Sequence, residues 1–253
     1  MGKSMLDKSS VAVVIPVYQP FLTENEEISL QQCLKVLAGY PIKIIKPRSL
    51  SVDFITKKYS SIEAISLDSQ HFEGIAAYNR LLISLDFYKQ FSAFKFMLIY
   101  QLDAFVFRDE LLQWCQEGYD YIGAPSLHNP EFDILPAASA QTFADALSSR
   151  RFVLNGGLSL RHIPAFIRYL KIYNTFYPAW VGNEDMLFSQ EATRLIPMKL
   201  FLKTPSWQEA LRFAFEKSPA ATYELTGHQL PFACHAWERY DPGFWSRFIP
   251  ENQ

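Results

Sequence analysis

The sequence predicts an α/β fold in which helices flank a mixed, mainly parallel central sheet. Apolar, β-branched runs such as VAVVIPVY (11–18) and FKFMLIY (94–100) are typical of strands that are buried on both faces. Segments with helical spacing of apolar residues separate such runs across residues 11–123, which indicates right-handed βαβ crossovers. Because the chain of 253 residues contains no repeat or linker, we expect a single domain over 1–253.

The elements of the first half follow from these two periodicities in chain order. We expect strands at 11–18, 41–47, 61–67, 94–100 and 119–124. We expect helices at 26–38, 51–59, 74–91 and 109–118. Ser51 is the expected cap of the second helix, since a serine side chain accepts a hydrogen bond from the first helical turn.

The pattern changes after residue 123. Residues 124–150 contain several prolines and show no period, so we expect a mobile loop there, and the polar residues 1–10 are expected to be flexible. A strand with a glycine pair (151–161) comes next, followed by a helix to about Tyr173 and a further helix that VGNED opens. The final predicted elements are a helix at 206–216 with Ser206 as its cap, and an aromatic C-terminal segment that packs back onto the domain.

Composition excludes several classes of partner. The net charge of −2 and the pI near 6.2 provide no basic field for nucleic acid or anionic lipid. The three cysteines lack disulfide or zinc spacing, which favours reduced thiols in the cytoplasm. The first apolar run is broken by Pro16 and is too short for an integral membrane span or a signal peptide. We therefore expect a soluble cytoplasmic protein.

Asp103 is the first residue with a pattern that suggests chemistry. It follows the apolar strand 94–100, and ligands in open α/β sheets bind beyond the carboxyl ends of the strands. A carboxylate there can hold Mg²⁺ or Mn²⁺ against phosphate oxygens. A turn or helix cap explains the same position equally well.

Two further positions have both a functional and a structural interpretation. The glycine pair in Asn155-Gly156-Gly157 permits a positive φ and a close approach of the backbone to a sugar, although a β-bulge without ligand explains it too. His235 is isolated among aromatic residues and is either a ligand or, more commonly, a histidine satisfied in the core.

The step NEDMLF contains two adjacent acids at the expected start of a helix. Glu184 and Asp185 are favoured there by the helix dipole alone. The functional interpretation is that one of the two carboxylates is a general base toward an acceptor hydroxyl.

The order of these motifs resembles that of GT-A glycosyltransferases over roughly residues 11–240. Members of that superfamily carry a nucleotide-binding first strand, a DxD motif, a glycine-rich loop, an xED motif and a late histidine. The corresponding residues here are VAVVIPVY, Gln101-Leu102-Asp103, Asn155-Gly156-Gly157, Asn183-Glu184-Asp185 and His235. The set YQLDAF, NGGLSLR, NED and PFACHAW is similar to one bacterial branch that is catalogued as a domain of unknown function.

The resemblance implies roles for individual residues. It assigns the metal to Asp103 and His235, and the catalytic base of an inverting enzyme to Asp185. The implied donor-binding residues are Pro16, Val17, Tyr18, Tyr78, Asn79, Gln101, Leu102 and Asp103. The implied sugar-binding and acceptor-binding residues are Asn155, Gly156, Gly157, Glu184 and Trp180, and Trp207 is a further candidate for stacking on a sugar.

The implied fold is a single GT-A-like, Rossmann-like domain. The implied reaction moves a sugar from a nucleotide-sugar donor, UDP-linked, to a hydroxyl of a glycan or lipid-linked glycan in polysaccharide biosynthesis, with Mn²⁺ or Mg²⁺ as cofactor. Gln101 replaces the first acid of DxD, so we expect weak metal binding without the donor. A nucleotidyltransferase is an alternative, although PVYQPFLTENEE lacks a glycine-rich basic loop, and Gln101 motivates a second alternative, a binding module without turnover.

Overall fold

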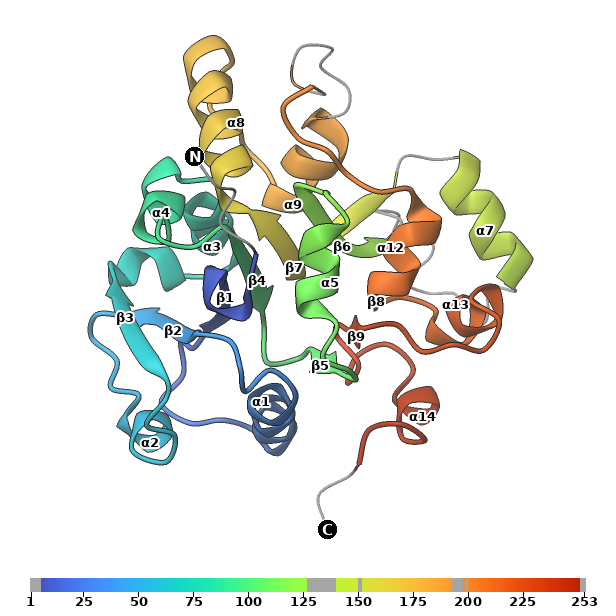
Figure 1. Cartoon of the computed structure of the whole chain (residues 1–253), viewed down its shortest axis with the longest axis horizontal. Helices are drawn as coiled ribbons and strands as arrows, with labels where there is room; N and C mark the ends of the chain where they lie inside the picture. The colour runs from blue at the N-terminus through green and yellow to red at the C-terminus, as the bar shows by residue number, and fades with distance from the viewer. Residues whose placement is uncertain (1–5, 127–139, 150–151, 193–197, 199, 251–253) are drawn as a thin grey trace.

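The computed structural model describes residues 6–126, 140–149, 152–192, 198 and 200–250 (Figure 1). Its main sheet has six strands in the order β3-β2-β1-β4-β7-β6. These are β1 (Val11–Pro16), β2 (Ile42–Pro47), β3 (Glu63–Leu67), β4 (Phe96–Tyr100), β6 (Tyr121–Ser126) and β7 (Val153–His162). Only β7 runs against its neighbours, which confirms the mixed, mainly parallel sheet.

The strand order reverses between β1 and β4. The chain passes from β1 outward through β2 to β3 and then returns to add β4 on the other side of β1. Such a reversal opens a crevice beyond the carboxyl ends of the two central strands, because their following segments diverge. This crevice positions the candidate site.

Helices cover both faces of the sheet. The helices of the described residues are α1 (Glu24–Val36), α2 (Asp53–Thr56), α3 (Ile75–Leu82), α4 (Leu85–Gln90), α5 (Leu111–Gln116), α7 (Ala140–Ser149), α8 (Ile163–Phe176), α9 (Glu184–Met186), α12 (Trp207–Phe213), α13 (Pro219–Leu225) and α14 (Pro242–Trp245). Because side chains alternate along a strand, Val11 and Val13 pack with α1, α2 and α5, whereas Ala12 and Val14 pack with α3, α4 and α8. The core therefore has two layers of apolar side chains around a fully buried β1.

A second sheet of three short strands lies beside the first. β5 (Phe105–Val106) pairs antiparallel with β9 (Ala233–Cys234), which pairs with β8 (Ala214–Phe215). The C-terminal aromatics Trp237, Phe244 and Trp245 bury themselves against this sheet, as the sequence predicted. The sheet fixes Asp103 and His235 near each other, because they stand at the same end of the paired strands β5 and β9.

Three expected elements differ in detail. The helix predicted at 74–91 is two helices, since Ser84 takes an extended conformation between α3 and α4. The helix predicted at 206–216 keeps its Ser206 cap but ends at Phe213, and the chain continues as β8. Val52 rather than Ser51 is the N-cap of α2, but Oγ of Ser51 still accepts from the backbone N–H of Asp53, the first residue of the helix, at 3.3 Å.

The predicted loop and N-terminus are also more regular than expected. β6 extends to Ser126 and α7 begins at Ala140, while residues 127–139 lie outside the described residues. Residues 8–10 form a single 3-10 turn that the Asp7 side chain caps, and residues 1–5 lie outside the description. Among the described residues, no helix combines the length and apolar character that crossing a bilayer requires.

Candidate functional site

The site begins where β4 ends at the sheet's central crevice. The backbone N–H of Gln101 donates to the carbonyl of Gly157 at 2.9 Å, which ties this turn to β7. Two residues later, the Asp103 side chain is 40% exposed, and its Oδ1 lies 3.2 Å from Nε2 of His235. The predicted pair of Asp103 and His235 therefore meets in space.

The His235 ring is held between several oxygens. Its Nε2 faces Asp103 and also lies 3.3 Å from Oε1 of Gln101, while Nδ1 lies 3.3 Å from Oε1 of Glu216. Burial alone lowers the pKa of His235, but the carboxylates of Asp103 and Glu216 outweigh it and raise the pKa to about 10. The same contact lowers the pKa of Asp103, although burial acts in the opposite direction. These neighbours favour the protonated form of the ring.

Glu216 is a site residue that sequence reasoning missed. It is only 6% exposed, and its Oε1 accepts from Nδ2 of Asn155 at 2.9 Å in addition to facing His235. Its Oε2 is buried without a hydrogen-bond partner. The sequence predicted a helix that continues to Glu216. In the structure the helix α12 ends at Phe213 and Glu216 follows the strand β8, so the predicted helix did not indicate a role for Glu216 in the site.

The donor set can be compared with what a divalent cation needs. Among the described residues, no three His, Cys, Asp or Glu side chains form a group that could hold a metal by themselves. However, Oδ1 of Asp103 is buried without a hydrogen-bond partner and converges with the Gln101 amide oxygen and with His235. These atoms fit one side of a coordination shell, whose other ligands would come from a bound phosphate group. His235 would have to lose its proton to take part.

The glycine pair of β7 separates two clusters of polar side chains. A Cβ on Gly157 would lie 2.3 Å from Nε2 of His235, and one on Gly156 would lie 1.8 Å from Oε1 of Glu184. The prediction of a positive φ is wrong, since neither glycine is among the described residues with a positive φ. The predicted close approach exists, but the neighbours are side chains of the protein. The β-bulge that the sequence allowed is present, because the β6–β7 register shifts opposite this segment.

Asn155 holds the bulge in shape. Its Oδ1 accepts from the backbone N–H of Gly157 at 2.7 Å, and its Nδ2 donates to Glu216. Both ends of the side-chain amide are therefore used within the protein. Asn155 connects the backbone of β7 to the carboxylate behind His235.

The Glu184 side chain is engaged within the protein. Its side chain is buried in an ion pair with Arg161, with 2.9 Å between Oε1 and Nη2. The Arg161 guanidinium is fully buried and also donates to the Tyr88 hydroxyl and the Gly156 carbonyl, at 2.8 and 3.1 Å. A charged residue in a strand buried on both faces requires such a partner, so the arginine in NGGLSLR was a signal that sequence reasoning passed over.

Asp185 has the environment of a general base. Its Oδ1 accepts from the backbone N–H of Met186 at 2.7 Å. Burial, and after it the neighbouring carboxylates of Glu184 and Glu216, raise the pKa of Asp185 to about 7. A pKa near the working pH is what an efficient base requires, because the group is then both deprotonated and basic.

The helix that carries Asp185 is held by α3. Asn79 Oδ1 accepts from the Glu184 backbone N–H at 2.9 Å, and Asn79 Nδ2 donates to Asn183 Oδ1 at 3.3 Å. Asn79 therefore caps α9, and its predicted contact with the nucleotide has to compete with this role. Trp180 donates from its indole to the Asn183 carbonyl at 3.0 Å and stays partly exposed beside the helix start.

The other predicted donor residues separate into buried and exposed ones. Pro16, Val17 and Leu102 are buried, so their side chains are not available to a nucleotide. Tyr18 is 57% exposed, and Glu26 and Asp103 contribute, after burial, to its raised pKa, which places it at the crevice. Burial also raises the pKa of Tyr78, which lies close to Gln101 and Glu184.

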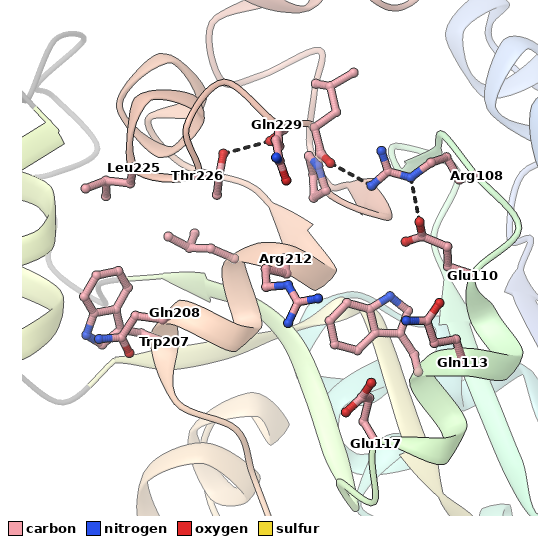
Figure 2. A pocket seen from close by; sticks show the side chains of 14 residues that line it. Arg108, Glu110, Gln113, Glu117, Trp207, Gln208, Arg212, Leu225, Thr226 and Gln229 are labelled. Atoms are coloured by element: carbon pink, nitrogen blue, oxygen red, sulfur yellow. Dashed lines mark hydrogen bonds and ion pairs between the residues drawn. The ribbon is translucent and has the colours of Figure 1, made fainter.

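Trp207 does not belong to this group. It lines a cavity of about 560 Å³ between α5, α12 and the segment after α13 (Figure 2). The structure thus brings Gln101, Asp103 and His235 together with Asn155 and the glycine pair. Asp185 is connected to this group through Glu216, whose carboxylate contributes to the raised pKa of Asp185. The structure leaves Trp207 in a different part of the molecule.

Comparison with known proteins gives one family. The family described as "Protein of unknown function (DUF5672)" matches residues 61–235. This range includes β4, the glycine pair, NED and His235. No curated protein matches the chain.

Solved structures resemble the chain in fold. The glycosyltransferase GlyE of Streptococcus pneumoniae TIGR4 matches with a TM-score of 0.51 at 10% identity, over 96% of this chain and 61% of GlyE. The galactosyltransferase LgtC, in complex with donor and acceptor sugar analogues, matches with 0.47 at 10%, over 96% and 97% of the two chains. The mannosyltransferase PcManGT of Pyrobaculum calidifontis, in complex with GDP-Man and Mn²⁺, matches with 0.47 at 12%, over 79% of this chain and 55% of that enzyme. The likeness to GlyE shows a fold of the glycosyltransferase type, and the chain spans 55% of PcManGT and 61% of GlyE, which is less than two thirds of either.

Proposed function

We propose that this chain, which belongs to the DUF5672 family, is a glycosyltransferase that moves a sugar from a nucleotide-sugar donor to an acceptor hydroxyl with inversion. The observation that carries the proposal is that a charged pair and a carboxylate with a raised pKa share Glu216 as a neighbour. Asp103 and His235 form the charged pair beyond β4, and Glu216, which contacts His235, also helps to raise the pKa of Asp185 to about 7. Group transfer from a diphosphate needs both a site that stabilises the leaving group and a base for the nucleophile.

The chain's own residues have distinct tasks in this mechanism. The donor diphosphate binds at the open side of Asp103 and His235, where the His235 imidazolium can donate a hydrogen bond to a phosphate oxygen. Glu216 holds the other ring nitrogen and thereby fixes the orientation of the imidazole. We assign the contact with the nucleotide to Tyr18, because it is exposed just after β1.

Asp185 acts on the acceptor. Its Oδ1 is engaged by the Met186 N–H, so the other carboxylate oxygen is the one that takes the proton from the acceptor hydroxyl. The deprotonated oxygen attacks the anomeric carbon from the face opposite the leaving diphosphate, which inverts the configuration. Asn79 and the Arg161–Glu184 pair keep the α9 start in place during this step.

A divalent cation has a place in the same proposal. Mn²⁺ or Mg²⁺ would be held by Asp103 and by His235 in its neutral form, which replaces the hydrogen bond from the imidazolium, and would neutralise charge on the leaving group. We infer that UDP-linked sugars are the donors and that glycans or lipid-linked glycans are the acceptors, following the resemblance of the motifs.

The test is a thermal-shift screen of UDP-linked and GDP-linked sugars with and without Mn²⁺. A specific donor raises the melting temperature by mass action, and we expect the rise to grow with Mn²⁺ and to vanish in Asp103→Asn. NMR of the anomeric proton in the product of the best donor then reports the stereochemistry. If no nucleotide sugar stabilises the protein, the proposal fails, and retention of configuration would remove Asp185 as the base.

A further inference from the structure

The cavity that contains Trp207 is separate from the candidate transfer site. It is bounded by α5, by α12 and by residues 225–231, and its volume is about 560 Å³ (Figure 2). Arg108 and Pro231, on its wall, lie five and four residues along the chain from Asp103 and His235. An extended chain of five residues spans at most about 18 Å, so the two sites are near each other but do not share residues.

The floor of the cavity is aromatic and aliphatic. Trp114 is 6% exposed and packs edge-on against Phe213, with ring centroids 5.4 Å apart, and Leu211 beside it is 2% exposed. Trp207 remains partly exposed and forms one wall (Figure 2). A ligand in the cavity would therefore contact flat apolar surface with at least one of its faces.

Neutral polar groups surround this floor. The exposed amides of Gln113, Gln208 and Gln229 line the cavity, each with donors and an acceptor. The Thr226 hydroxyl also lines it and donates to the Gln229 carbonyl at 2.7 Å. A fully apolar ligand would strip water from these groups without replacing its hydrogen bonds, which is unfavourable.

The charges of the lining are already balanced. Arg108 pairs with Glu110 at 2.9 Å and donates to the Leu230 carbonyl at 2.8 Å, and Arg212 pairs with Glu209 at 3.1 Å. Glu117 adds a further negative charge to the wall. An anionic ligand would have to break one of these ion pairs or approach Glu117, so the lining favours an uncharged ligand.

We propose that this cavity is a second carbohydrate-binding site that takes a short neutral saccharide. A pyranose has apolar C–H faces that stack on indole rings, and its rim carries hydroxyls that pair with amides. The volume is within the range of roughly 300–1,000 Å³ that is usual for small-molecule sites. In a glycosyltransferase this second site would anchor a glycan acceptor, and that role rests on the proposed function. The binding of a saccharide to the cavity does not depend on it.

The test is a titration of the full-length ¹⁵N-labelled chain, followed through the indole N–H signals of its five tryptophans. The probes are maltotriose, cellotriose, mannotriose and lactose, with sialyllactose as the anionic comparison. We expect saturable shifts of the Trp114 and Trp207 signals with at least one neutral saccharide below about 10 mM. Trp207→Ala should weaken that binding by at least about tenfold, as is common for a buried aromatic contact.

Phe54→Ala provides the matched control, because Phe54 is a 41% exposed aromatic on α2 outside the cavity. This variant should bind the saccharide as the wild type does. The proposal is overturned if no neutral saccharide moves the two indole signals, if Trp207→Ala binds normally, or if sialyllactose binds more tightly than lactose. Since no donor is present, these results do not depend on whether the chain transfers sugar.

Discussion

The two sides of the β7 glycine pair carry similar charges in different surroundings. On the Gly157 side, His235 lies between Asp103 and Glu216, and Asp103 is 40% exposed. On the Gly156 side, Arg161 pairs with Glu184, and both side chains are buried. We call Arg161 and Glu184 the sealed pair, because both side chains are shielded from solvent and the pair can only stabilise the structure. We call Asp103, His235 and Glu216 the open cluster, because the exposed Asp103 can exchange its proton or its partner for a ligand. The comparison separates a cluster that holds structure together from one that is open to a ligand.

The largest effect is expected from breaking the sealed pair. Arg161→Met leaves the Glu184 carboxylate buried without its partner, and loss of one member of a buried pair costs about 3–5 kcal/mol. Chemical denaturation should show this loss of unfolding free energy. The double variant Arg161→Met/Glu184→Leu should recover much of it, because no charge is then left unpaired. A single variant as stable as the wild type would show that the pair is not structural.

Asp185 lies next to the sealed pair but is expected to act on the functional side. Asp185→Asn should lower kcat by about 10²–10⁴ while the donor still binds, since the base acts on the acceptor. In the wild type, kcat should rise with pH through about 7, as the carboxylate loses its proton. Steady-state kinetics across pH 5–9 checks both statements, and a normal kcat in the variant would exclude this base.

The raised pKa of Asp185 also makes the stability of the protein depend on pH. Because its folded pKa is raised above that of an unfolded aspartate, the stability that Asp185 contributes is complete at low pH and is lost as pH rises through about 7. Asp185→Asn, which has no charge to bury, should therefore be more stable than the wild type at pH 8, by about 1–3 kcal/mol. Thermal unfolding at pH 5 and pH 8 measures the difference, and an equal effect at both values would contradict the assignment.

Variants of Asp103 and His235 test whether the two side chains contribute jointly to donor binding. Asp103→Asn should abolish donor-dependent stabilisation and any stimulation by Mn²⁺ while leaving the fold intact, because asparagine has the same shape and the side chain is 40% exposed. His235→Ala should have a milder effect. Since the two side chains contact each other, the double variant should lose less than the sum of the two single losses. Strictly additive losses in a thermal-shift assay would mean that they act separately.

Much of this arrangement follows from local sequence, and the rest does not. Strand and helix periodicity located every strand of the main sheet, and the position of Asp103 after β4 predicted its place at the crevice. The contact of Glu216 with His235 was not predicted, because it depends on the pairing of β8 with β9. These strands have two residues each and pair at a separation of 19 residues, which is too short a pattern to give a periodic signal in the sequence. The ion pair of Glu184 was not predicted because its partner, Arg161, comes from another element, and no local pattern records that contact.

The smallest expected change in stability comes from Glu216→Gln. This variant tests most directly whether the charge behind His235 matters for the site. Glu216→Gln keeps an oxygen for the Asn155 amide but removes the negative charge behind His235. The raised pKa of His235 means that its contribution to stability is complete below the unfolded value and is lost as pH rises through about 10. Without the Glu216 charge the pKa of His235 should fall, so this loss should begin at a lower pH. Long-range ¹H–¹⁵N NMR of the ring nitrogens measures the pKa directly. An unchanged pKa would show that Glu216 does not act on His235. A positioning role predicts both a lower pKa and weaker donor binding with little change in overall stability at pH 6, whereas a merely structural Glu216 would leave donor binding unchanged in the folded variant.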